Sequence, residues 1–154
     1  MNIQKEITEF TTSIKNKPIE FVKIILQGVK KLSVKTIENM IDWVETNLKD
    51  DPSLDKMSDY VGYSSFYCSV KFHEVVGISF KEYVIRRKLT QAALELRESK
   101  LKIIDIAFKY GFSSNEAFSR AFHKKYGYSP SQFRKVLPQV RLYDKSIIIS
   151  NPPQ

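Results

Sequence analysis

Apolar side chains recur at intervals of three and four residues along most of the chain, which is the spacing of one face of an amphipathic helix. One such run covers residues 34–48, and Ser33 before it has the side chain of a helix N-cap. The run ends at residues 50–52 (Asp-Asp-Pro), and Ser53 is suited to cap a second helix. The pattern predicts an all-α protein whose main body begins near residue 33.

Two copies of one local pattern lie about fifty residues apart in the chain. The tetrapeptide at 62–65 (Gly-Tyr-Ser-Ser) recurs at 111–114 (Gly-Phe-Ser-Ser), and each copy follows a short apolar-periodic segment. Segment 72–77, which begins with Phe and ends with Gly, recurs as 122–127. Since glycine lets the chain turn sharply between two packed helices, each copy is typical of a helix-turn-helix unit.

A long helix is predicted between the two units. Ser79 followed by Glu82 has the capping-box pattern, and residues 80–98 contain neither glycine nor proline. A helix of this length spans about 25–30 Å, close to the separation of about 34 Å between successive major grooves on one face of DNA. Such a linker helix can place two DNA-reading units one helical turn apart.

The predicted architecture has about seven core helices preceded by short N-terminal helices. Lys17-Pro18 divides the apolar pattern of the N-terminal segment in two. Ser129-Pro130 opens a last helix near 130–137, and residues 140–149 have an extended pattern. The expected divisions are an accessory segment at 1–32, a DNA-binding domain at 33–137 and a tail at 138–154, the domain comprising a first unit at 33–84, a linker helix at 80–98 and a second unit at 99–137.

Net charge and composition limit the classes of function that this chain can have. The net charge is +8, and the positive charge is concentrated: residues 33–62 carry 3 basic and 7 acidic side chains, whereas residues 63–137 carry 14 basic and 6 acidic ones. This asymmetry favours a face that binds duplex DNA. The lone Cys68 and two histidines exclude an internal disulfide and a zinc site, and no catalytic set, metal site or cofactor site is apparent. Without an apolar membrane span or signal-peptide core, the expected compartment is the cytoplasm.

The second helix of each unit carries the candidate base-reading residues. Arg120 can donate two hydrogen bonds to guanine, Asn115 can pair with adenine, and Glu116 can accept from cytosine. A phosphate contact or an ion pair with Glu116 is the alternative role of Arg120. In the first unit, Phe66 and Val70 are suited to thymine methyl groups. The full candidate set comprises Asn115, Glu116, Ser119 and Arg120 in the second unit and Ser65, Phe66, Ser69 and Val70 in the first.

Candidate phosphate contacts lie at the helix starts and along the linker helix. A serine that caps a helix leaves backbone amides able to bind a phosphate. The run Arg86-Arg87-Lys88 is the strongest basic cluster, for which a solvated helix face is the alternative interpretation. The candidates are Ser64, Ser113, Ser114, Arg86, Arg87, Lys88, Lys124 and Lys125.

These residues resemble the DNA-binding domain of the AraC/XylS family of bacterial transcription regulators, in particular its compact MarA/SoxS/Rob type. The resemblance covers about residues 36–135, and its most specific part is Ile106-Ala107 with Tyr110-Gly111-Phe112, followed by Phe118-Ser119-Arg120-Ala121-Phe122. Residues 41–48 resemble the first helix of that domain, residues 83–99 its linker helix, and residues 127–134 the end of its signature.

The resemblance implies a two-headed domain that binds promoter DNA as a monomer and recruits or positions RNA polymerase, in a bacterial, nucleoid-associated protein. Arg120 stands at the family's base-contacting arginine, whereas Val70 and Phe66 replace the arginine and tryptophan of the stress activators in the first head. The expected function is a sequence-specific regulator of the activator kind. A non-specific architectural DNA binder and a DNA-binding fragment of a larger effector-responsive regulator are the alternatives, and a protein-interaction module would leave the charge asymmetry unexplained.

Overall fold

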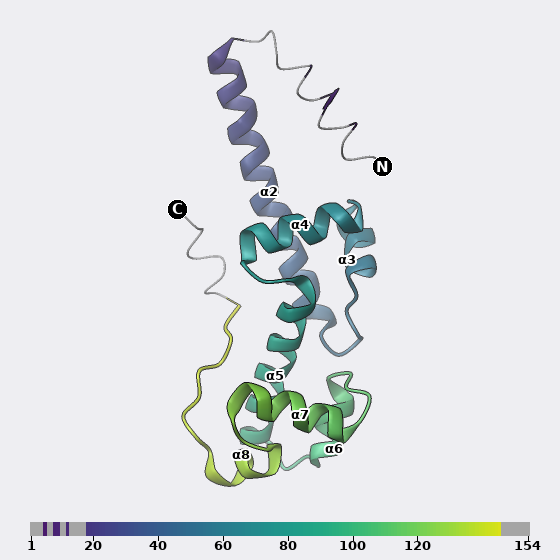
Figure 1. Ribbon diagram of the computed structural model, residues 1–154, viewed down its shortest axis with the longest axis vertical. Coiled ribbons are helices and arrows are strands. Elements are labelled where there is room, and N and C mark those ends of the chain that lie inside the picture. The colour runs from purple at the N-terminus through teal and green to yellow at the C-terminus, as the bar shows by residue number, and fades with distance from the viewer. Residues whose placement is uncertain (1–4, 6–7, 10–11, 13–17, 146–154) are drawn as a thin grey trace.

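The computed structural model describes residues 5, 8–9, 12 and 18–145 and is an elongated all-helical molecule with two heads (Figure 1). The first head contains α2 (Ile19–Asn47), α3 (Leu54–Val61) and α4 (Ser65–Val76). A linker helix, α5 (Phe80–Glu98), leads to the second head, which contains α6 (Ile103–Lys109), α7 (Asn115–Tyr126) and α8 (Pro130–Val136). From residue 18 to residue 145 there are thus seven helices and no strand, which confirms the predicted fold class.

Serine side chains begin five of these helices, as the sequence pattern predicts. Each serine oxygen accepts a hydrogen bond from the backbone N–H three residues further on. In the second unit the cap is Ser114 rather than Ser113. At Ser79 the structure shows the serine half of the expected capping box, while the Glu82 carboxylate pairs with Arg86 Nε at 2.8 Å. The five capping residues are Ser53, Ser64, Ser79, Ser114 and Ser129.

The expectation that the body begins at a cap on Ser33 is wrong. Helix α2 starts after Pro18 and runs without interruption to Asn47, so Ser33 lies in its interior. The predicted resumption of the helical pattern after Pro18 is confirmed, because α2 begins at Ile19 and proline is compatible with a helix start. Serine and glycine inside a helix carry only a modest free-energy penalty, which the packed C-terminal half of α2 offsets. The apolar side chains of the pattern before Pro18, namely Ile3, Ile7, Phe10 and Ile14, lie outside the described residues.

Each head has its own hydrophobic core, and α5 contributes to both. Tyr83 and Val84 belong to the core of the first head, whereas Leu89 and Leu96 belong to that of the second. Because one continuous helix is buried at both ends, the relative position of the two heads is set by α5. The first core consists mainly of Ile37, Met40, Ile41, Val44, Leu48, Met57, Cys68, Phe72 and Phe80, and the second of Ala92, Ala93, Ile106, Ala107, Tyr110, Phe118, Phe122, Tyr126 and Phe133.

Glu95 of α5 connects this helix to α6 through one ion pair and one further hydrogen bond. Its carboxylate accepts a hydrogen bond from Lys109 Nζ and another from the Tyr110 hydroxyl at 2.8 Å. Burial pushes the pKa of Glu95 upward, but these two donors outweigh burial and hold the pKa below the ordinary value of 4.5. The ionised carboxylate is therefore part of the packing of the second head.

We expect the stability contribution of Glu95 to disappear in acid. A carboxylate whose pKa is lower in the folded protein stabilises the fold above its unfolded pKa, and the contribution is lost as the pH falls through the folded pKa. The free energy of unfolding of the wild type should therefore exceed that of Glu95→Gln at neutral pH, and the difference should shrink as the pH falls below 4.5. Urea denaturation of both proteins at several pH values measures this difference. A gap that does not change with pH would contradict the assignment.

The tail after α8 runs back along the molecule as an extended segment without helix or strand through residue 145 (Figure 1). This agrees with the extended pattern expected from residue 140, whereas residues 146–149 of that pattern lie outside the described residues. Across the described ranges, no helix combines the length and apolar character that a membrane crossing requires.

Candidate nucleic-acid interface

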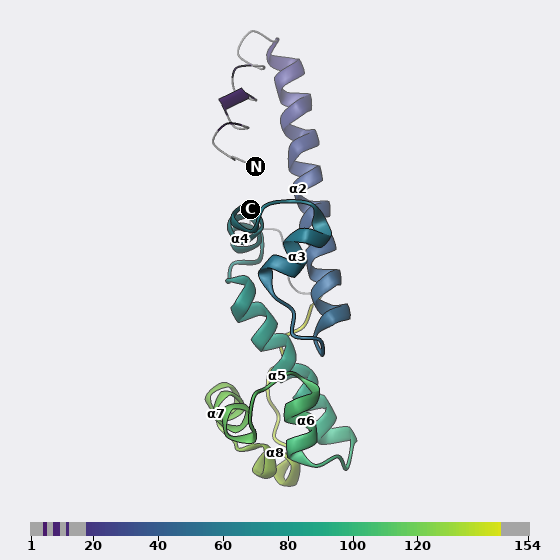
Figure 2. The same cartoon turned by 90° about the vertical axis from the view of Figure 1, so that its right-hand side faces the viewer.

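Helices α4 and α7 have matching surroundings in the two heads. Each follows a tight turn in which a glycine adopts the left-handed conformation, with φ of +78° at Gly62 and +75° at Gly111. Their inner faces are buried through Cys68 and Phe72 in α4 and through Phe118, Phe122 and Tyr126 in α7. Figures 1 and 2 show both helices on the same side of α5. The outer faces of α4 and α7 therefore point to a common side of the molecule.

The two helices correspond position by position, and the correspondence reveals a chemical difference. Both contain 12 residues, and both begin after a capping serine, Ser64 or Ser114. Counting from these caps, the second helical residue is Phe66 in α4 and Glu116 in α7. The sixth is Val70 in α4 and Arg120 in α7. The first head thus presents an apolar pair where the second presents a charged pair.

The side chains of these four residues all reach the surface. Phe66 is 70% exposed and Val70 is 40% exposed, so neither is part of the core of the first head. Glu116 and Arg120 are also exposed. Phe66 and Val70 are therefore accessible to a binding partner of the first head.

Three of the four remaining base-contact candidates are only partly accessible at the surface. Ser65 is half-buried and donates its hydroxyl to Asp55 at 2.6 Å. Ser119 and Asn115 are half-buried, and the Asn115 Oδ1 atom is buried without a hydrogen-bond partner. A base contact by Asn115 would require the side chain to turn outward, which would also release this unsatisfied oxygen. Ser69 is exposed.

Two of the phosphate candidates must be withdrawn. Arg87 is 6% exposed, and its guanidinium pairs with Glu45 at 2.7 and 2.8 Å. Lys88 is 7% exposed, with Nζ 3.9 Å from Asp51 Oδ1, and burial lowers the pKa of this ammonium. The reason is helical geometry: three consecutive residues point in directions about 100° apart, so only Arg86 of the run remains near the surface.

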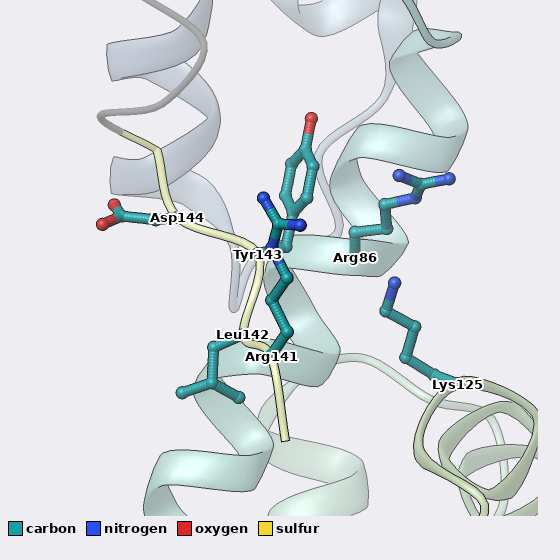
Figure 3. Close-up of a pocket in the computed structure, with 6 residues that line it drawn as sticks. All are labelled: Arg86, Lys125, Arg141, Leu142, Tyr143 and Asp144. Atoms are coloured by element: carbon teal, nitrogen blue, oxygen red, sulfur yellow. The ribbon is translucent and has the colours of Figure 1, made fainter. Parts of the chain in front are cut away.

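Arg86 and Lys125 are brought together by the fold. They come from α5 and from the last turn of α7 and line a pocket of about 330 Å³ (Figure 3). A third cation, Arg141 of the tail, lines the same pocket, and sequence reasoning missed it. Its charge was the only signal in the sequence, because nothing local predicts that the tail returns to α5. Lys124 and Ser113 are exposed at the surface of the second head, and Ser64 and Ser114 remain at the starts of α4 and α7.

Comparison with known proteins agrees with this arrangement. A family model described as a helix-turn-helix domain matches residues 57–136, more than half of the chain. The transcriptional activator AarP of Providencia stuartii is 38% identical over 98 residues, which cover 64% of this chain and 73% of AarP. The chain belongs to the AraC-type family of DNA-binding transcription regulators. The multiple antibiotic resistance protein MarA of Escherichia coli K12 is 35% identical over 99 residues, which cover 64% of this chain and 78% of MarA.

Solved structures lead to the same family. The C-terminal domain of AraT, a response regulator from Geobacillus stearothermophilus, superposes with a TM-score of 0.63 and 25% identity, covering 71% of this chain and 91% of that one. The AraC-type relatives are transcription regulators rather than enzymes. The family match begins in α3 and ends with α8, so α2 and the tail lie outside it.

Proposed function

We propose that this AraC-type protein is a sequence-specific transcription regulator of the activator kind that inserts α4 and α7 into successive major-groove segments of one asymmetric promoter site. The observation that carries the proposal is the position of two matched helices on one side of α5, which is buried in the cores of both heads. A helix fits the major groove of B-DNA, and a buried linker fixes the spacing of two such helices.

In the second head, Arg120 and Glu116 are the proposed direct readers. The exposed guanidinium of Arg120 can donate two parallel hydrogen bonds to the O6 and N7 atoms of guanine. Glu116 can accept a hydrogen bond from the amino group of cytosine. Asn115 and Ser119 lie beside them and complete the set. This head therefore reads a half-site that contains a G·C pair.

In the first head, Phe66 and Val70 give a different kind of readout. Neither side chain can donate or accept a hydrogen bond, but both can contact the C5 methyl group of thymine, which only A·T pairs present in the major groove. Ser69 adds one adaptable hydrogen-bonding group, and Ser65 another if its bond to Asp55 is released. The two half-sites should consequently differ in base composition.

Phosphate contacts position the protein without reading sequence. We assign them to the amides at the starts of α4 and α7, next to Ser64, Ser113 and Ser114, and to the surface cations. The positive end of each helix dipole faces this region, which favours a phosphate there. The cations are Arg86, Lys124 and Lys125.

The proposed partners follow from the AraC-type relatives. AarP is named a transcriptional activator. We therefore infer that this chain binds promoter DNA as a monomer, acts on RNA polymerase, and works in the bacterial cytoplasm on the nucleoid. One two-headed chain already offers two reading helices, so a dimer is not required to contact two major-groove segments.

Selection of bound duplexes from a random pool of about 30 base pairs, about three helical turns, tests this proposal. We expect an asymmetric site, with affinity for the winner well above that for a scrambled duplex at every salt concentration. An architectural DNA binder would enrich no sequence and would bind both duplexes equally, with the same steep salt dependence. Failure of both duplexes to bind at moderate salt would favour a protein-interaction module.

Replacement of thymine by uracil in the selected site tests the assignment of Phe66 and Val70. Each lost methyl contact should cost about 0.8 kcal/mol, because uracil differs from thymine only by the missing methyl group. The loss should occur in the half-site read by α4, and Val70→Ala should abolish the distinction at one position. Titrations of the substituted duplexes measure the effect. Equal affinity for uracil and thymine duplexes would contradict methyl readout.

A further inference from the structure

The tail lies outside the AraC-type family match, but it is held firmly against α5. The Tyr143 carbonyl accepts a hydrogen bond from Arg87 Nη1, and the Tyr143 amide donates to Thr90 Oγ1 at 3.1 Å. Its ring lies edge-on to Tyr83 at a centroid distance of 5.8 Å and packs against the core of the first head. Both backbone polar groups of one residue are thus used in docking, which fixes the tail at this point.

Contacts on either side of Tyr143 extend the docking over both heads. At the start of the tail, the Pro138 carbonyl accepts a hydrogen bond from Arg97 at 2.9 Å. Val140 and Leu142 pack against the core of the second head. At the last described residue, Lys145 forms an ion pair with Asp42 of α2. Residues 138–145 therefore cross from the second head to the first along α5.

Docking places Arg141 beside two other cations. The pocket that Arg141 lines with Arg86 and Lys125 receives side chains from α5, α7 and the tail. Figure 3 shows the Lys125 ammonium directed toward α5, which carries Arg86, and the Arg141 guanidinium beside the ring of Tyr143. The one acidic residue of the lining, Asp144, directs its carboxylate to the opposite side.

We propose that Arg141 completes a phosphate-binding seat, formed with Arg86 and Lys125, that holds the DNA backbone between the two half-sites. The tail is then a third DNA-binding element of this protein, in addition to the two helix-turn-helix heads. This inference rests on the proposed DNA-binding function and adds a contact that the helix-turn-helix units do not contain.

Electrostatics favour an anion in this pocket. Three cations line this one pocket and make the potential inside it positive, so an anion is attracted there. Arg86 is partly neutralised by Glu82, but Lys125 and Arg141 are exposed. Phosphate oxygens fit the donors, because arginine can give two parallel hydrogen bonds and lysine a point charge.

Position favours DNA as the source of the phosphate. In the sequence of α5, Arg86 lies between Val84, which belongs to the core of the first head, and Leu89, which belongs to that of the second. Lys125 lies in the last turn of the second reading helix. Two major-groove segments on one face of a duplex are separated by a minor groove bordered by phosphates. We therefore infer that this pocket, at the end of α7 and between the heads, meets that backbone when α4 and α7 occupy the grooves.

The test is Arg141→Gln in the full chain, measured on the selected duplex and on a scrambled one over a range of salt concentrations. We expect weaker binding by the same factor on both duplexes and a slope of log affinity against log salt that is smaller by about 0.9, the value for one lost phosphate contact. Arg141→Lys should restore most of the slope. Because Arg141 is exposed, the thermal transition should not move.

Lys145→Gln is the matched control, since it removes the same charge from the same tail at an ammonium that Asp42 already neutralises. An unchanged salt slope in Arg141→Gln, or an equal change of the slope in both variants, would contradict the proposed phosphate-binding seat. A loss confined to the selected duplex would also overturn it, because a phosphate contact carries no sequence preference. Tripolyphosphate binding that Arg141→Gln abolishes, with an unchanged DNA slope, would assign the pocket to a small phosphorylated molecule instead of DNA. If the selection yields no preferred site but Arg141→Gln still lowers the salt slope, the phosphate-binding seat is supported and the sequence-specific function is contradicted.

Discussion

Replacement of Arg87 by methionine is expected to lower the free energy of unfolding by about 3–5 kcal/mol, the cost of removing one partner from a buried ion pair. The guanidinium lies between α2, α5 and the tail, where it donates two hydrogen bonds to Glu45 and one to the Tyr143 carbonyl. Glu45 also accepts a hydrogen bond from the Tyr83 hydroxyl at 3.2 Å. Without Arg87, the Glu45 carboxylate is left largely buried with no cation beside it, and the tail loses an anchor.

Denaturant titration of Arg87→Met, Glu45→Leu and the double variant gives the coupling between the two residues. The double variant should recover part of the stability lost in Arg87→Met, because an apolar pair leaves no unpaired charge. Recovery should be incomplete, since the Tyr83 hydroxyl and the Tyr143 carbonyl still lack partners. Additive losses would show that Arg87 stabilises the fold without its ion pair. The matched replacement Arg86→Met removes a surface pair and should cost about 1 kcal/mol or less.

The contrast between Arg86 and Arg87 shows where sequence reasoning about charge stops. A run of three cations gives the local charge, and the predicted helix gives the directions of the side chains. The residues that contact each side chain are distant in sequence: Glu45 lies 42 positions from Arg87, and Tyr143 lies 56 positions from it. No local pattern contains that information. The same limit hid Arg141, whose role depends on where the tail docks.

Local chemistry, by contrast, predicted most of the fold. Capping serines, glycine turns and apolar faces act within one or two helical turns, so their signals are complete in the sequence. The linker helix was predicted over 80–98, and the structure gives Phe80–Glu98. Ser33 was misassigned because a serine before an apolar run resembles a cap whether or not a helix already precedes it. Only the continuity of α2 through that residue decides between the two cases.

For the interface, the sequence predicted which residues of each reading helix point outward. The structure adds the alignment of the two helices, position by position. The capping serines align α4 with α7, and this alignment pairs Val70 with Arg120 and Phe66 with Glu116. The heads share one backbone design, and the chemistry of these two exposed positions differs between them. One consequence is that the two half-sites should contribute specificity through different contacts, which can be removed one at a time.

The second large effect is expected from Arg120→Ala, which should weaken binding to the selected site by about 1–3 kcal/mol. A bidentate contact to guanine is lost on that site only, so affinity for a scrambled duplex should hardly change. Reselection with the variant should relax one base position in the α7 half-site and leave the α4 half-site as it was. Because Arg120 is exposed and absent from both cores, the free energy of unfolding should be unaffected.

Lys124→Ala provides the comparison, since it removes a cation exposed on the same helix four residues later. That variant should lose affinity equally on both duplexes and lower the salt slope by about 1, as a phosphate contact does. If Arg120→Ala gave the same uniform loss, Arg120 would be a phosphate contact and α7 would lack its proposed guanine reader. If Arg120→Ala weakens binding to the selected duplex only and Lys124→Ala weakens binding to both duplexes, base reading and backbone binding are separated within one helix. A general charge effect would weaken binding by the two variants in the same way, because the two cations lie only one helical turn apart.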